Sequence, residues 1–169
     1  MTRADAEGWF AYLRDPRVTQ LTSYSVTDLS DIDTILTSYE DLRKTGTAAR
    51  WAILNDLDGS LIGQTSFYLW DETNHLAELG FDLAPHYWNR NITTRAAALV
   101  IQWAFSHPAI HRVQAVVNTQ NSGSLRVLSK LGFQIERTLP SYRICAGHPA
   151  DYFMLGLTND AFRDSQDLL

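Results

Sequence analysis

The second half of the chain alternates between segments with the periodicity of strands and segments with the periodicity of helices. Strands are predicted at 76–83, 112–117 and 134–139, and helices at 96–105 and 122–131 lie between them. Strands that are joined through a helix need a crossover connection, and such connections favour parallel pairing. A last strand is predicted at 152–157.

The first half of the chain predicts a β-hairpin that follows two helices. A helix is expected over 4–14, and Asp28 is the expected N-cap of a second helix with apolar residues at helical spacing. Strands at 51–54 and 61–69 flank a turn that contains Gly59, a residue suited to positive φ. Hairpin strands pair antiparallel, so the whole pattern predicts an α/β fold with a mixed sheet and flanking helices. In the helix at 96–105, the apolar side chains expected to face inward are Leu99, Val100 and Trp103.

The length of 169 residues fits one domain, and we expect a single domain over 1–169. No apolar run approaches the roughly 20 residues that span a bilayer, and the first residues lack the apolar core of a secretory signal. Cys145 is the single cysteine, which excludes an internal disulfide and suits a reducing compartment. These features predict a cytoplasmic protein without a membrane partner.

Positive charge is concentrated in one part of an acidic chain. Residues 85–137 contain six Arg or Lys residues and one glutamate, a net charge of +5, whereas the whole chain carries −5. The overall balance argues against general nucleic-acid binding. The basic segment can instead hold a compact anion, although chance clustering on a solvated surface would give the same count.

Three segments resemble the GNAT superfamily of N-acetyltransferases, most closely its RimJ/RimL-like branch. They are 77–83 (AELGFDL), 87–96 (YWNRNITTRA) and 121–133 (NSGSLRVLSKLGF), where a predicted helix ends at a glycine. The resemblance covers roughly residues 50–158 and implies a mostly antiparallel twisted sheet and acetyl-CoA as co-substrate. It places Asn121 at the pantetheine arm and Ser124 near the sulfur, although either residue can equally be an N-cap. Relatives usually open with a strand, which is apparently missing here.

The segment before the helix at 96–105 is the expected pyrophosphate loop, because a helix start offers free backbone N–H groups and a partial positive charge. Asn91 stands where the family usually has a glycine, and Arg95 replaces a common glutamate. Because of these departures, the protein could instead be a non-catalytic module that binds acyl-CoA or serves as a scaffold. Taken alone, the segment could also be an ordinary helix start. The residues expected at the cofactor are Phe81, Asp82, Leu83, Asn89, Arg90, Asn91, Ile92, Thr93, Thr94, Asn121 and Lys130.

Acetyl transfer to an amine needs a proton acceptor, a donor for the developing oxyanion and an acid for the thiolate. The resemblance makes Glu78 the general base acting through water, although a strand glutamate on the surface is an equal alternative. Backbone N–H groups near Phe81 and Asp82 are expected to polarise the thioester, and Ser124 to protonate the thiolate. Tyr142 is expected to line the acceptor site. The five histidines show no metal-ligand spacing, so no metal is expected.

The acceptor expected from the resemblance is a primary amine, either a protein N-terminus or a small molecule, with transfer in a ternary complex. The sequence does not choose between them. The missing first strand would leave the strand at 51–54 as an open sheet edge, and open edges invite pairing. We therefore also expect a homodimer or another covering element.

Overall fold

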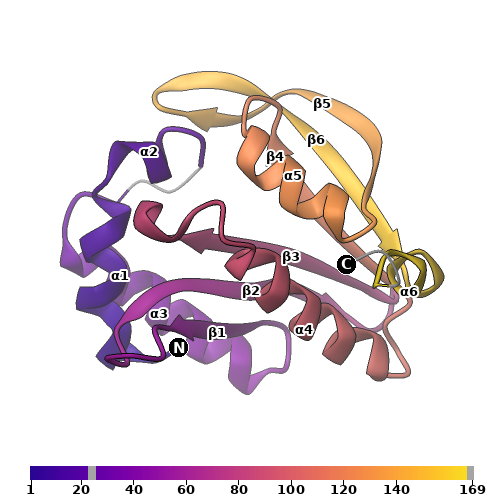
Figure 1. Ribbon diagram of the computed structural model, residues 1–169, viewed down its shortest axis with the longest axis horizontal. Coiled ribbons are helices and arrows are strands. Elements are labelled where there is room, and N and C mark those ends of the chain that lie inside the picture. Colours follow the sequence, from indigo (N-terminus) through magenta and orange to yellow (C-terminus); the bar gives the residue numbers. More distant parts are fainter. Residues whose placement is uncertain (23–25, 167–169) are drawn as a thin grey trace.

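A six-stranded sheet in the order β1-β2-β3-β4-β6-β5 forms the centre of the computed structural model, which describes residues 1–22 and 26–166 (Figure 1). Among the described strands, β3 and β4 pair in parallel and every other neighbouring pair is antiparallel. The predicted mixed, mostly antiparallel sheet is therefore confirmed. The strands are β1 (Ala49–Leu54), β2 (Leu61–Asp71), β3 (Leu76–Leu83), β4 (Arg112–Asn118), β5 (Gln134–Cys145) and β6 (His148–Thr158).

The helices lie on both sides of this sheet. Asp28 caps α3 as predicted, because its carboxylate accepts a 2.8 Å hydrogen bond from the Ser30 N–H. The short α2 and the C-terminal α6 were not predicted. The helices are α1 (Ala6–Leu13), α2 (Pro16–Thr19), α3 (Leu29–Lys44), α4 (Ile92–Ser106), α5 (Ser122–Lys130) and α6 (Asn159–Gln166), with 3₁₀ turns η1 (Arg3–Asp5) and η2 (Pro85–Tyr87).

Two neighbouring residues of β1 show which helices cover which face. The Arg50 guanidinium lies 4.4 Å from the ring centre of Trp9 in α1 and 3.9 Å from that of Tyr39 in α3. The next side chain, Trp51, lies 5.3 Å from the Trp103 ring in α4. Successive strand residues point to opposite faces, so α1 and α3 cover one face and α4 the other. Figure 1 shows α4 and α5 in front of the sheet and α3 fainter behind it.

The parallel pair β3–β4 is short and then opens. Pairing runs from Leu76–Arg112 to Glu78–Gln114, after which β3 continues beside β2 and β4 beside β6. The two strands therefore form a fork in the middle of the sheet. The backbone groups of β3 beyond Glu78 that point toward β4 have no strand partner there.

The prediction for α4 was wrong for Leu99 and only partly right for Trp103, whose half-exposed ring packs against Phe67 and Trp70. Val100 is buried, but Leu99 is 68% and Trp103 48% exposed. The helix begins four residues before the predicted start, and the face it buries repeats at i, i+3, i+4 and i+7. Leu99 and Trp103 fall beside that face. The buried face consists of Ala97, Val100, Ile101 and Ala104.

The β5–β6 hairpin is longer than the predicted strands at 134–139 and 152–157, and it reaches back to the N-terminal part of the chain. Near its tip, the Cys145 thiol donates a 3.1 Å hydrogen bond to the carbonyl of Gln20, just after α2. The hairpin therefore contacts the segment that follows α2, on the side of the sheet where the fork opens.

Candidate functional site

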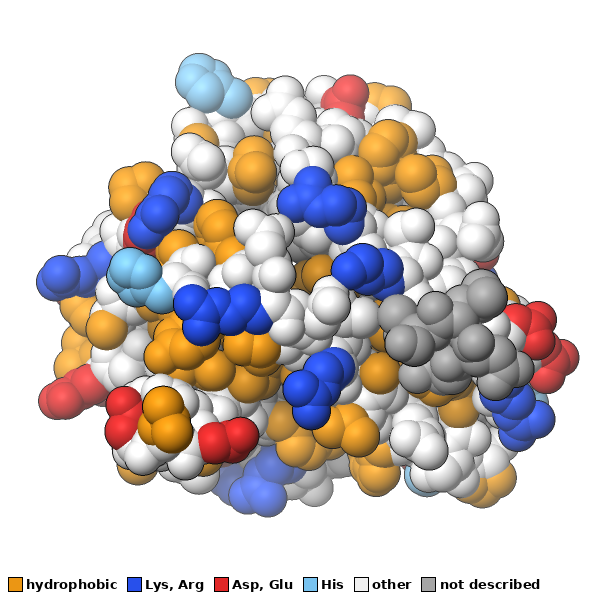
Figure 2. Space-filling view, in the orientation of Figure 1, with side chains coloured by type: hydrophobic (Ala, Val, Ile, Leu, Met, Phe, Trp, Pro, Cys, Tyr) orange, Lys and Arg blue, Asp and Glu red, His pale blue; other side chains and the backbone are white. Residues whose placement is uncertain are grey.

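A cavity of about 390 Å³ lies between the α2 segment, the end of β3, the β3–α4 loop and α5. Figure 2 shows Lys and Arg side chains gathered in the middle of this face, with acidic side chains toward its rim. All eleven residues expected to bind the cofactor line this cavity, together with Arg17 and Arg126, which were not predicted. The cations that line it are Arg17, Arg90, Arg126 and Lys130.

The start of α4 faces this cavity with unpaired backbone donors. Asn91 is the N-cap in the left-handed region, at φ 57°, and its side chain caps no N–H of the helix. The first intrahelical bond runs from the Arg95 N–H to the Asn91 carbonyl at 3.0 Å. The N–H groups of 92–94 therefore have no intrahelical acceptor, and the helix dipole adds partial positive charge. Arg95 itself is exposed and lies outside the cavity lining.

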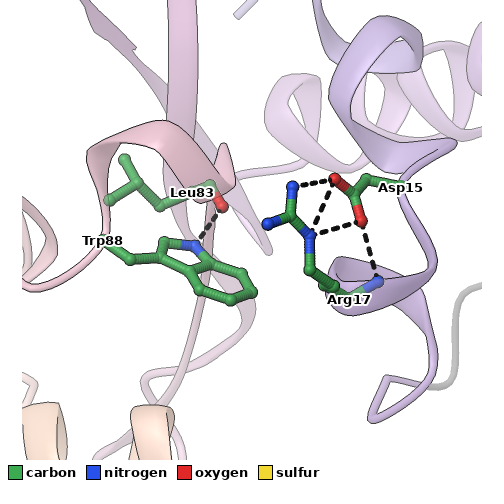
Figure 3. Close-up of polar contacts among 4 residues, drawn as sticks. All are labelled: Asp15, Arg17, Leu83 and Trp88. Atoms are coloured by element: carbon green, nitrogen blue, oxygen red, sulfur yellow. Dashed lines mark hydrogen bonds and ion pairs between the residues drawn. The ribbon is translucent and has the colours of Figure 1, made fainter.

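The cavity walls are fixed by two side-chain contacts that face each other in Figure 3. The Trp88 indole N–H donates a 2.7 Å hydrogen bond to the carbonyl of Leu83, which folds the loop back onto β3. Opposite it, Asp15 pairs with the Arg17 guanidinium and accepts the Arg17 N–H at 2.9 Å. The hydrogen bond from the Arg17 side chain lowers the pKa of Asp15 to about 2. Arg17 is thus held beside the cavity entrance.

The backbone of β3 presents alternate N–H groups to the fork. The Ala84 N–H donates to the Ile62 carbonyl at 2.8 Å, and the pairing register of β2 and β3 continues from this bond. Antiparallel pairs alternate between bonded and non-bonded residues. By this alternation the N–H groups of Phe81 and Leu83 point toward the fork, and that of Asp82 points to β2.

The side chain of Asp82 is occupied within the fold. The carboxylate is buried and accepts hydrogen bonds from Tyr12 Oη at 2.5 Å, Gln64 Nε2 at 2.6 Å and Trp9 Nε1 at 3.3 Å. Burial raises the pKa of Asp82, and the hydrogen bonds from Tyr12 and Gln64 act against that rise. Asp82 therefore joins α1 to β3, and the geometry favours Phe81 and Leu83 over Asp82 as donors in the fork.

Glu78 lies at the point where the fork opens. It is 8% exposed, and its two carboxylate oxygens accept hydrogen bonds from Tyr68 Oη and Gln114 Nε2, both at 2.6 Å. A register shift in β2 around Tyr68 brings the phenol to this face. Gly80 leaves room for the ring, since a Cβ there would lie 2.9 Å from Tyr68 Cε1. Glu78 is therefore held in place and is not a free surface glutamate.

Asn121 and Ser124 have different roles at the start of α5. The Asn121 side-chain oxygen accepts the Ser124 N–H at 3.0 Å, so Asn121 is the N-cap. Ser124 is the third residue of the helix, and its hydroxyl makes none of the hydrogen bonds found among the described residues. The half-buried Ser124 hydroxyl lines the cavity and is available to a ligand.

Tyr142 lies on the β5–β6 hairpin, outside the cavity lining. Its ring meets that of Tyr152 edge-on at 5.9 Å between ring centres and is 46% exposed. The Arg143 guanidinium lies 5.1 Å from the Tyr142 ring centre and 5.8 Å from that of Tyr152. Tyr142 thus belongs to an aromatic and cationic group beside the fork.

Two further observations concern other kinds of site. Across residues 1–22 and 26–166, no three His, Cys, Asp or Glu side chains are grouped so that they could hold a metal ion. In the same part of the chain, every helix is too short or too polar to cross a bilayer.

The acetyltransferase (GNAT) domain family matches residues 1–134. The chain belongs to the GNAT family of N-acetyltransferases. The uncharacterised N-acetyltransferase p20 of Bacillus licheniformis is 30% identical over 158 residues, which cover 93% of this chain and 89% of p20. This relationship makes the protein a GNAT N-acetyltransferase, as the three sequence segments predicted.

Solved GNAT structures share the fold at low identity. The ribosomal L7/L12 alpha-N-protein acetyltransferase RimL, in complex with CoA, superposes with a TM-score of 0.86 at 16% identity, covering 95% of this chain and 92% of RimL. The spermidine N-acetyltransferase of Vibrio cholerae, in complex with CoA and spermine, gives 0.82 at 13% identity, covering 96% and 95%. The predicted similarity to the RimJ/RimL-like branch is confirmed at the level of the fold.

Several residues near the GNAT site escaped the sequence analysis. Tyr68 and Gln114 come to Glu78 from neighbouring strands, and only the pairing register reveals them. Arg17 and Arg143 come from α2 and from the distant hairpin. The one available signal was Gly80, two residues after Glu78, because an interior strand glycine often marks a close approach.

Proposed function

We propose that this GNAT protein transfers the acetyl group of acetyl-CoA directly to a primary amine in a ternary complex. The observation that carries the proposal is the fork between β3 and β4. Glu78 lies at its base, and the cationic cavity with the open start of α4 lies beside it. A binding site for the anionic co-substrate and a proton acceptor therefore lie next to each other at the fork.

The residues of the cavity fit the anionic end of acetyl-CoA. Its pyrophosphate needs several donors in a small space, and the free N–H groups of 92–94 meet that need at a helix start. Arg90 and Lys130 add full charges, and Asn89 and Asn91 hold the loop in left-handed conformations. When bound, acetyl-CoA supplies the acetyl group as an activated thioester. The amide nitrogen of Asn121 remains for the pantetheine arm, since its oxygen caps α5.

Three groups of this chain have separate roles in the reaction: one accepts a proton, one stabilises negative charge and one donates a proton. Through a water molecule, Glu78 accepts the proton that the acceptor ammonium must lose before the neutral amine can attack, while Tyr68 and Gln114 fix the position of Glu78. The N–H groups of Phe81 and Leu83 face the fork, where an acyl oxygen would develop charge. Attack of the neutral amine forms the carbon–nitrogen bond. When the carbon–sulfur bond then breaks, the Ser124 hydroxyl donates a proton to the sulfur and regains the proton that the acetylated nitrogen loses.

The acceptor is a protein N-terminus or a small-molecule amine. Both classes occur among proteins of this fold, as the names of the RimL and spermidine enzymes state. Glu78, Tyr142 and Tyr152 mark the acceptor side, and Tyr142 is exposed enough to meet a substrate. Family membership supports an enzyme over the scaffold alternative.

Release of CoA thiol over a panel of amines tests this function. Glu78→Gln should lower kcat by about 10²- to 10⁴-fold, and most at low pH, because proton removal from the ammonium is hardest there. Ser124→Ala should lower kcat with little change in acetyl-CoA affinity. Glu7→Gln and Ser129→Ala are matched controls on exposed positions. Full rates in both test variants would remove Glu78 and Ser124 from the mechanism.

A further inference from the structure

The face of the sheet that carries Glu78 continues into the β5–β6 hairpin. Gln114 and Asn118 lie on one face of β4, because strand residues two or four positions apart share a face. Asn118 pairs with Tyr152 of β6, which brings Tyr152 onto the same face as Glu78. The Arg143 guanidinium lies over the ring of Tyr152. A substrate that approaches Glu78 across this face therefore passes Arg143.

Arg143 is a half-buried cation that forms no ion pair among the described residues. By contrast, Arg17 pairs with Asp15 and Arg112 pairs with Glu136. The Asp151 carboxylate, on the same hairpin, accepts the Ser141 N–H at 2.8 Å and so stabilises the hairpin backbone. A partly desolvated charge without a counter-charge favours an anion beside it.

The surroundings of Arg143 place its charge close to the proton acceptor. Burial lowers the pKa of the Arg143 guanidinium, and its interactions with Tyr68, Tyr142 and Glu78, which include a hydrogen bond with Tyr142, outweigh this and raise it. Among the described residues, Glu78 forms no ion pair with Arg143, and its two oxygens accept hydrogen bonds from Tyr68 and Gln114. The cation therefore lies within electrostatic reach of any amine bound near Glu78.

We propose that Arg143 is a specificity-determining residue, which selects acceptors whose amine is flanked by a carboxylate or another anionic group. A guanidinium binds a carboxylate with two parallel hydrogen bonds, and the Arg143 guanidinium lies against the rings of Tyr142 and Tyr152. The same charge repels the second ammonium of a polyamine. The inference deepens the proposed function and rests on it for the place of the acceptor.

Matched acceptors that differ only in one charge test this selection. The small pair is 4-aminobutyrate and 4-aminobutanamide, and the peptide pair is Ser-Glu-Ala and Ser-Gln-Ala, both amidated; spermidine is the cationic acceptor. In the native protein we expect kcat/KM to be about 10- to 100-fold higher for the anionic member, the usual range for a hydrogen bond to a charged group. A larger ratio of kcat/KM, anionic over neutral member, for the small pair would indicate a small-molecule acceptor. A larger ratio for the peptide pair would indicate an acidic N-terminus.

Arg143→Gln should abolish this ratio through KM, with kcat for the neutral acceptors retained, and should raise the rate with spermidine. Arg143→Lys keeps the charge and should keep part of the ratio. It replaces Arg143→Gln as the test if the glutamine variant fails to fold. Arg163→Gln removes one exposed charge on α6 and should leave the ratio intact. No preference in the native protein, a preference for spermidine, or a ratio that survives Arg143→Gln would overturn the inference.

A second readout separates this inference from the proposed function. If no amine releases CoA thiol, the proposed function fails. Calorimetric titration of the CoA-loaded protein with 4-aminobutyrate then decides the inference alone. Binding that Arg143→Gln weakens at least 10-fold would support it, and equal affinity for the amide would refute it.

Discussion

Lys130 Nζ donates a 2.7 Å hydrogen bond to the side-chain oxygen of Asn91, which joins the end of α5 to the cap of α4. Both residues line the cationic cavity. The contact explains how an asparagine can stand where the GNAT pattern usually has glycine. Asn91 tolerates the left-handed backbone at φ 57°, and its side chain gains a charged partner. The bond directs the charge of Lys130 toward the loop.

Asn91→Gly should tighten acetyl-CoA binding. Glycine keeps the left-handed conformation without a side chain, so a phosphate can approach the loop more closely, and Lys130 loses its bond to Asn91 and becomes free to meet that phosphate. We expect Kd to fall by up to about fivefold in calorimetry. Asn89→Gly is the matched control, since Asn89 has φ 60° but no bond to Lys130. Weaker binding by Asn91→Gly would show that its side chain contacts the ligand.

Acetyl-CoA should raise the melting temperature, and its phosphates should cause most of the rise. At 100 times Kd, mass action adds about 2.7 kcal/mol of stability, or roughly 5–10 °C for a chain of this size. Pantetheine lacks the phosphates that the cations of the cavity would meet, so its shift should be much smaller. Added salt should weaken the acetyl-CoA shift. Equal shifts for the two ligands would contradict an anion site at the start of α4.

Gly80→Ala should lower turnover through Tyr68. The new Cβ would lie 2.9 Å from a Tyr68 ring atom, so the phenol must leave its hydrogen bond to Glu78. We expect a loss of about 1–3 kcal/mol in stability from overpacking, and a lower kcat. Steady-state kinetics measure the change in kcat, and thermal unfolding measures the change in stability. Adding Gly80→Ala to Tyr68→Phe should lower kcat no further; an additive loss would place the effect of Gly80 elsewhere.

The pairing of Asp15 with Arg17 should make stability depend on acid pH. The folded pKa of Asp15, about 2, lies below the ordinary value of 3.8 because Arg17 donates to its carboxylate. This contribution is therefore present above about pH 4 and lost as the pH falls toward 2. The difference in unfolding free energy between the native protein and Asp15→Asn should shrink over that window. A difference that stays constant down to pH 2 would exclude the Arg17 pairing as its source.

The edge strand β1 should be covered by a second copy of the chain. β1 ends the sheet in the described structure, and the Met1 ammonium donates a 3.0 Å hydrogen bond to the Arg50 carbonyl. The exposed side chains of Leu99 and Trp103 in α4 lie on the same side as Trp51. Light scattering at micromolar concentration should show a dimer, and Trp103→Lys should dissociate it. Leu57→Lys, at 94% exposure in a hairpin turn, is the control.

The Arg50 carbonyl points to the open edge, so the Ala52 amide also faces that edge and the Trp51 amide faces β2. A monomer with rapid hydrogen exchange at the Ala52 amide would contradict the dimer. Such a result would mean that charged neighbours alone protect this edge, as lysine and other charges do in many sheets.

Local signals placed most elements because they act within a few residues. Asp28 capped α3 as expected, and β3 begins and ends where its pattern predicted. Gly59 takes a positive φ in the predicted turn. The hairpin β5–β6 was predicted too short, because most side chains of β5 and most of those in the turn-proximal residues of β6 are exposed, so the outer part lacks a strong apolar alternation.

The amino-acid pattern was sufficient to predict the GNAT family, the sheet with its flanking helices, and the concentration of positive charge in the segment around Asn91. These depend on periodicity, caps and motif spacing, which are local properties of the chain. Three features could be seen only in the folded structure. They are the hydrogen-bond partners of Glu78, the burial of the Asp82 side chain against α1, and the position of Arg143 beside the fork. Strand register, a bulge and a long hairpin bring these side chains together, and each depends on packing between residues far apart in the sequence.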